Sequence, residues 1–411
     1  MFLNSLTVDD VNTAYASMAK PNENLVILVR SPKKEGVEVP SQEDILAIKA
    51  EVEAAELEPY EDNTVIRPLI DPSVKLKGSK VKSTVENESL GYTEWTLKNG
   101  IQVVVRPSTL KADEVTISAV SDGGCSLLSD AEYQHGAFLS MVMSQSGIAD
   151  FSNTELARQL SGKSAYAGLG VDSYEHSAYA GGSPKDLETI LQLLYLNFTS
   201  PRFDETDLDN LKRMYVPYYM NMESDPNYIM GREFQNTLFG GHVRRQITSA
   251  ADIEALNIPM LQSVHSQLFS YADDFRFIIV GNVDLETLRP LVEKYIGSLP
   301  TSNKVEYAVV DDGVRFATGE VTNDFRVAMQ QPKVSVRLVY SGPMEYNAKN
   351  RLIVDLLSRA LDMRYLESIR EEKGGTYGVS VQGGNIDEPV ENYMLAIIFD
   401  TNEALADELV A

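Results

Sequence analysis

The sequence holds a single cysteine, Cys125, and four histidines among its 411 residues. One cysteine excludes an intrachain disulfide and a zinc site built from thiolates. No motif that would activate a nucleophile surrounds it, so we interpret it as a small buried or loop residue. Two imidazoles on one helix face must lie close in sequence to bind one metal ion. The four histidines are far apart in the sequence, so no such helical pair is present: they are His135, His176, His242 and His265.

Basic residues and long apolar runs are also scarce. The chain has 36 Lys and Arg against 60 Asp and Glu, which gives a net charge of −24. This balance argues against binding of nucleic acid, because a phosphate-binding face needs clustered Lys and Arg. No apolar stretch approaches the roughly 20 residues of a membrane span. Residues 1–6 have no basic start or apolar core, so no secretion signal is visible. The compartment stays open between a bacterial periplasm and the cytoplasm.

An internal repeat organises the chain. Residues 6–29 read as a helix, a polar turn and an apolar strand, and residues 256–279 repeat this pattern. Each copy is followed by another helix, near 42–57 and near 284–296. The second copy closes a domain that begins near Gly91, whereas the first copy has no such domain before it. We therefore interpret residues 1–58 as the C-terminal remnant of an upstream domain.

A second, looser repeat relates the fronts of two later domains. Residues 111–123 and 333–342 each read as a strand that runs into a glycine turn, with a helix after it. Strands and helices mix without regular β-α-β alternation, which favours an α+β fold with antiparallel or mixed sheets packed with helices. The proline-containing, charged residues 59–90 read as a linker. We expect residues 91–300 to form one domain, opening on a hairpin with its turn at 98–100, and residues 305–411 to form a second, truncated one.

The most informative segment lies between residues 353 and 381. Apolar residues at three- and four-residue steps predict one buried helical face: Ile353, Leu356, Leu357, Ala360, Leu361, Tyr365 and Ile369. Two glycines then allow the chain to reverse, and Thr376 to Val381 reads as a short strand.

This arrangement places the guanidinium of Arg370 and the phenol of Tyr377 near one end of a helix–strand pair, as donors for a developing oxyanion. A purely structural reading exists for both residues. An arginine in a last helical turn complements the helix dipole, and Tyr377 shares strand parity with Val379 and Val381, as a half-buried aromatic residue would.

The run from Tyr365 to Val379, with Arg370, the glycine pair and Tyr377, resembles the Arg/Tyr segment of the pitrilysin-like (M16) zinc peptidases. The resemblance implies a protein of two halves, each a pair of similar α+β domains, of which this chain is the second, non-zinc half. It further implies that Arg370 and Tyr377 are catalytic donors to the scissile carbonyl, and that Gly374, Gly375 and Thr376 contact the substrate.

The family's metal motif, H-x-x-E-H on a helix, is missing. The helix that would carry it by analogy, residues 136–143, offers Leu139, Val142 and Met143, and none of these is a zinc ligand. The resemblance thus implies no cofactor in this chain and zinc in the missing first half. The implied partners are that N-terminal, zinc-bearing half and a peptide or unfolded polypeptide substrate, which an exposed sheet edge would bind by main-chain pairing.

Two alternatives remain open. The chain could be a catalytically silent M16-like scaffold or assembly subunit, which has no need of the Arg/Tyr pair. It could also be an unrelated α+β binding module in which Arg370 and Tyr377 are structural. Their substitution would then alter stability and leave peptide hydrolysis untouched.

Overall fold

A computed structural model describes residues 5–18, 23, 25–31, 36, 38–56, 65–302 and 307–411. The chain divides into two compact units, Met1–Asn63 and Thr64–Ala411. The boundary between them falls near the start of the predicted 59–90 linker. No helix of the described residues is long and apolar enough to cross a membrane.

The first unit contains two helices, α1 (Val8–Met18) and α2 (Gln42–Ala54). Both were expected from the repeat, and Ser41 and Asp44 form a capping box at the start of α2. No residue of either helix is buried. Residues 25–29, expected as a strand, are not one. A strand needs a neighbouring strand to pair with its N–H and C=O groups. The described residues of this unit include no strand that residues 25–29 could pair with.

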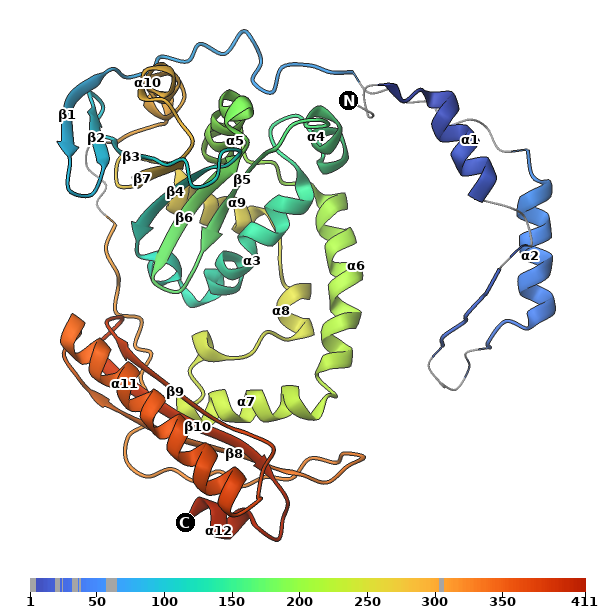
Figure 1. The fold of residues 1–411 in the computed structure, drawn as a ribbon, viewed down its shortest axis with the longest axis vertical. Helices are drawn as coiled ribbons and strands as arrows, with labels where there is room; N and C mark the ends of the chain where they lie inside the picture. Colours follow the sequence, from blue (N-terminus) through green and yellow to red (C-terminus); the bar gives the residue numbers. More distant parts are fainter. Residues whose placement is uncertain are drawn as a thin grey trace. The chain divides into compact units, whose positions relative to one another are not determined.

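The second unit is built on a seven-stranded sheet (Figure 1). Its strands are β1 (Val81–Asn87), β2 (Tyr92–Leu97), β3 (Gln102–Pro107), β4 (Val115–Asp122), β5 (Ala165–Val171), β6 (Glu175–Gly182) and β7 (Arg276–Gly281). The order is β1-β2-β3-β7-β4-β6-β5, and only the β3–β7 pair is parallel. The predicted hairpin turn joins β2 and β3. The linker expected to end at residue 90 was placed too far along the chain, because β1 already pairs with β2.

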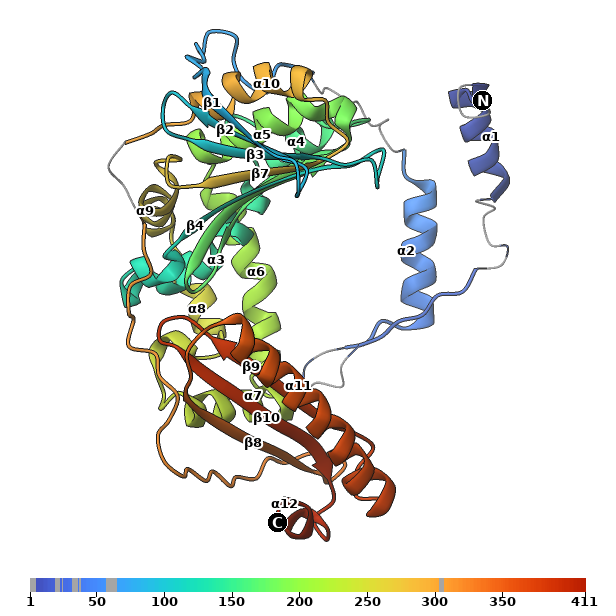
Figure 2. The same ribbon diagram turned by 60° about the vertical axis from the view of Figure 1, so that its left-hand side comes forward.

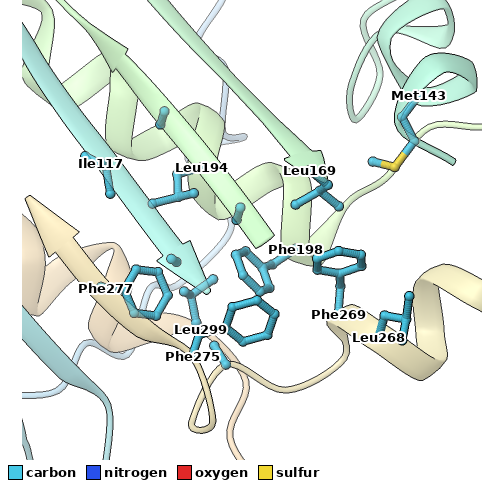
Figure 3. Close-up of a cluster of buried hydrophobic side chains, with 14 of the residues drawn as sticks. Ile117, Met143, Leu169, Leu194, Phe198, Leu268, Phe269, Phe275, Phe277 and Leu299 are labelled. Atoms are coloured by element: carbon cyan, nitrogen blue, oxygen red, sulfur yellow. The ribbon is translucent and has the colours of Figure 1, made fainter. Parts of the chain in front are cut away.

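Helices pack around this sheet. They are α3 (Asp130–Ser146), α4 (Asn153–Gln159), α5 (Leu187–Thr199), α6 (Glu205–Met222), α8 (Ala250–Glu254), α9 (Ile258–Phe269) and α10 (Leu285–Lys294). A further helix of the described residues, α7 (Pro226–Leu238), contributes no side chain to the core against this sheet. Four phenylalanines from α5, α9 and β7 with its preceding turn gather in the core (Figure 3). The rings of Phe198 and Phe275 meet edge to face, with centroids 5.2 Å apart. Strand β7 of the repeat therefore lies in the middle of the sheet, between β3 and β4, and helices α9 and α10 of the same repeat contribute side chains to the core.

The C-terminal part forms a three-stranded sheet, β8 (Val334–Pro343), β9 (Val379–Ile386) and β10 (Asn392–Thr401), in the order β8-β10-β9. Helix α11 (Ala348–Tyr365) follows β8, and α12 (Ala406–Val410) follows β10. The antiparallel order repeats that of β4, β6 and β5, which agrees with the sequence echo between residues 111–123 and 333–342. The α+β fold class is therefore confirmed.

The prediction of the buried face of α11 was partly wrong. Ile353, Leu356 and Leu357 are 45%, 56% and 47% exposed, whereas Val354 and Ser358 are buried. The side that packs on β9 runs through Val354, Ser358, Leu361 and Tyr365. Both sides of this helix carry apolar residues at helical spacing, so periodicity alone could not tell which of them meets the sheet.

Candidate functional site

The helix that carries Arg370 ends in a wide, glycine-terminated turn. Residues Leu366–Glu372 continue α11 as a π-helical segment, a feature often found near functional sites. The N–H of Gly374 then bonds to the carbonyl of Arg370 at 3.1 Å, and that of Gly375 to the carbonyl of Ile369 at 3.0 Å. This nested pair resembles a Schellman cap widened by one residue. Gly374 has φ of 59°, in the left-handed region that glycine adopts without strain.

A hydrogen bond, a packing contact and an ion pair hold the loop after this turn in place. Thr401 of β10 donates a hydrogen bond of 2.6 Å from its hydroxyl to the carbonyl of Gly375. Gly375 is buried and lies against Leu409 of α12, while Lys373 forms an ion pair with Glu408. Both main-chain polar groups of Gly375 are therefore engaged inside the protein. Of the expected substrate-contacting residues, Gly375 supports the loop, and Gly374 and Thr376 remain at its surface.

The guanidinium of Arg370 stands at the surface of this turn. Its side chain is 50% exposed, and Nε lies 3.7 Å from a carboxylate oxygen of Glu371. At this distance and exposure the ion pair is weak and screened by solvent. The five N–H donors of the guanidinium thus remain accessible to an incoming acceptor.

Tyr377 is fully exposed, at 101% of the reference value. The residue lies in a bend, because β9 begins at Val379 and not at Thr376 as predicted. The Thr376 hydroxyl explains this delay: it accepts a bond of 3.3 Å from the Gly378 N–H and donates one of 3.0 Å to the Gly378 carbonyl, which turns the chain locally. In the described residues the phenol makes no hydrogen bond, and the half-buried position considered from strand parity is wrong.

The site therefore consists of one donor, Arg370, near the end of the π-helical segment and a second, Tyr377, on the anchored loop that follows, and both face solvent. Oxyanion stabilisation is strong only where donors act in a water-excluded site. Two cavities of the described residues, one beside Asn153 and Tyr215 and one beside Arg351 and Gly384, are not lined by Arg370 or Tyr377. These donors can bind a carbonyl or carboxylate oxygen, but they need a second surface to exclude water around it.

The position examined for zinc is part of the hydrophobic core. Leu139, Val142 and Met143 of α3 are all buried, and the described residues contain no group of three or more His, Cys, Asp or Glu placed to hold a metal ion. His135, one residue before the helix position considered for zinc, is not at the surface. It is buried in α3, where its Nε2 accepts a bond of 3.2 Å from the N–H of Asn257.

Other candidate nucleophiles and bases are buried as well. Burial raises the pKa of the Cys125 thiol to about 12, which leaves it unreactive and confirms its reading as a small buried residue. Burial also lowers the pKa of His176 to about 4, and its ring packs edge to face on Phe269, Phe275 and Tyr307. Sequence reasoning did not find Thr401 or Leu409 as supports of the loop, since neither stands in a motif.

Residues 255–411 match the family model described as "Peptidase M16 inactive domain". The C-terminal part of the chain, residues 255–411, therefore carries an M16-type inactive domain. A curated relative, "Zinc protease PQQL-like" of Arabidopsis thaliana, is 21% identical over 93% of this chain and 38% of its own length.

Two solved structures share the fold. The periplasmic protease PqqL from Escherichia coli superimposes with a TM-score of 0.74 and 21% identity, over 90% of this chain and 40% of its own. A point mutant of the ferredoxin protease FusC, in complex with Arabidopsis ferredoxin, gives 0.70 and 18%, over 91% and 40%. The chain thus spans about two fifths of the length of each of these relatives.

Proposed function

We propose that this chain is the non-zinc half of a zinc-dependent endopeptidase. It binds peptide or unfolded polypeptide and supplies Arg370 and Tyr377 as hydrogen-bond donors to a zinc site on an N-terminal half. The observation that carries this proposal is the match of residues 255–411 to an M16 domain described as inactive. The same chain aligns with little more than a third of a protein named a zinc protease.

The chemistry of the two donors supports this role. Arg370 keeps its charge at any physiological pH and presents a rigid fork, and the Tyr377 phenol can donate one further bond. In the assembled enzyme they would meet the scissile carbonyl oxygen, or adjacent peptide backbone, as negative charge develops. Zinc on the other half would polarise the carbonyl and activate water. The co-crystallised ferredoxin of the FusC relative supports a polypeptide substrate.

The test is cleavage of a quenched fluorescent peptide library with zinc present. The chain is assayed alone and mixed with a zinc-bearing M16 half encoded beside it. We expect activity only in the mixture. Arg370→Ala and Tyr377→Phe should each lower turnover by about 10². Matched controls are Arg364→Ala, on the same helix with its side chain 70% exposed, and Tyr340→Phe, 54% exposed on β8. Neither control should change the rate.

A second candidate is the silent scaffold, which the exposed position of both donors also permits. It predicts a stable, well-folded complex with the partner half and no effect of the Arg370 and Tyr377 variants on hydrolysis. Activity indifferent to both variants would therefore reject the catalytic role. The periplasmic origin of the PqqL structure makes the bacterial periplasm the first compartment in which to look for that complex.

A further inference from the structure

We propose that the outer edge of β9 at Gly383–Asn385, together with the groove between it and α11, binds an extended peptide that carries an acidic side chain. This inference deepens the proposed function and rests on it, because it names how this half would hold the polypeptide and which residue type it prefers. Figure 2 shows α11 lying along the three-stranded sheet.

The edge itself follows from the hydrogen bonds of β9. The strand pairs with β10 on one side, and no described strand pairs with its other side. The N–H of Val381 donates to the carboxylate of Asp362 at 2.9 Å, so Val381 points away from β10. Main-chain groups alternate in direction along an antiparallel pair. Gly383 and Asn385 therefore also direct their N–H and C=O groups outward, where a peptide strand can pair with them.

A groove of about 530 Å³ lies beside this part of the edge. Its walls are Arg351, Leu352 and Asp355 of α11 and residues 383–385 of β9. A Cβ added to Gly383 would clash with Oγ of Ser358 on α11, whereas one added to Gly384, which points to the opposite face of the sheet, would meet no atom within 4 Å. Glycine within a strand often marks a place where another backbone approaches closely. The groove therefore has both the room and the main-chain partners for a short extended segment.

The positive charge of Arg351 in the groove favours an acidic side chain on the bound peptide. Arg351 stacks over the ring of Tyr346 at 5.5 Å, and no carboxylate among the described residues forms an ion pair with it. Asp355 is already bonded to Arg359 through both oxygens at 3.1 Å. The groove thus presents one guanidinium that its neighbours leave unneutralised, beside the exposed Leu352. An Asp or Glu side chain of the peptide complements this position by a charge-assisted hydrogen bond.

Asp362 sets the limit of the edge. Its carboxylate occupies the outward N–H of Val381, so an incoming strand cannot pair there, and its charge repels an acidic residue at that end. Arg351 lies near the opposite end, since α11 runs back along β9. The two residues together fix where along the edge the acidic side chain binds.

Direct binding tests the inference without zinc or a partner half. Fluorescein-labelled peptides of Thr and Val with one central Glu, or with Lys in its place, are titrated with the full chain and followed by anisotropy. We expect the Glu peptide to bind about tenfold more tightly than the Lys peptide. Arg351→Gln should remove that difference, whereas Lys349→Gln, on the same helix at a position that does not line the groove, should preserve it.

N-methylated peptides test the main-chain pairing on the ligand side. Methyl groups on alternate residues in one phase should abolish binding, and those in the other phase should not. Equal binding of Glu and Lys peptides, or equal loss in both phases, would overturn the proposal. So would a dimer of this chain that excludes the peptide, which would assign the edge to a second copy. Binding without hydrolysis in the mixed assay would instead sink the proposed function and leave this site standing.

Discussion

Gly375 and Leu409 are in contact so close that no side chain fits between them. A Cβ added to Gly375 would lie 2.5 Å from Cδ1 of Leu409. The contact joins the loop that carries Tyr377 to α12, and it lies next to the bond from Thr401 to the Gly375 carbonyl. The position of the candidate site therefore depends on a helix that follows it in sequence by some thirty residues.

Gly375→Ala should destabilise the chain by about 1–3 kcal/mol, because the new methyl group overpacks the site. Leu409→Ala in the same chain should relieve part of this cost, which a double-mutant cycle by urea denaturation measures. Gly374→Ala, with open space around its Cβ but φ of 59°, should cost about 1 kcal/mol and show no coupling to Leu409. Additive effects of the Gly375 and Leu409 substitutions would contradict the contact.

Arg244 should be among the residues most sensitive to substitution. Its side chain is 8% exposed and reaches Asp130 at 2.7 Å, the carbonyl of Cys125 at 2.9 Å and that of Leu128 at 2.6 Å. Arg244→Met should cost about 3 kcal/mol, since it leaves these acceptors without a donor. Arg326→Met breaks an ion pair with Glu403 that is 91% and 79% exposed and should cost less than about 1 kcal/mol. Equal denaturation midpoints for the two variants would refute this account.

Stability should fall on mild acidification. Burial lowers the pKa of His176 to about 4 from its usual 6.5, so the folded state binds this proton less well than the unfolded state. The resulting stability is fully present above pH 6.5 and is lost as the pH falls towards 4, by at most about 1.4 kcal/mol per pH unit. His176→Phe should flatten the dependence, while Phe275→Leu should lower stability equally at each pH. An unchanged slope in His176→Phe would disprove the assignment.

Metal should have no part in the stability of this chain alone. The described residues hold no ligand cluster, and the helix position expected for zinc is filled by buried Leu139, Val142 and Met143. We expect the same Tm with and without a chelator and less than stoichiometric zinc after desalting. A Tm that falls on addition of a chelator would show that the chain binds a stabilising metal ion and would contradict this prediction.

The sequence predicted the positions of helices and strands better than it predicted which strands pair with one another. The repeat correctly placed α1, α2, α9, β7 and α10, because helical periodicity and capping residues are local signals. It failed at residues 25–29, where the same apolar pattern as in β7 forms no strand. In β7 that pattern is held between β3 and β4, and residues 25–29 have no such neighbours among the described residues of their unit.

The candidate site shows the same division. The sequence by itself determined that this chain has no closely spaced histidine pair for zinc, that a glycine turn follows Arg370, and that the family segment contains Tyr377. Only the tertiary structure decided that Tyr377 is fully exposed, that Gly375 is buried under α12, and that β9 leaves an open edge beside Arg351. Residue types and spacing fix local chemistry, whereas burial and strand pairing depend on contacts between segments far apart in the chain.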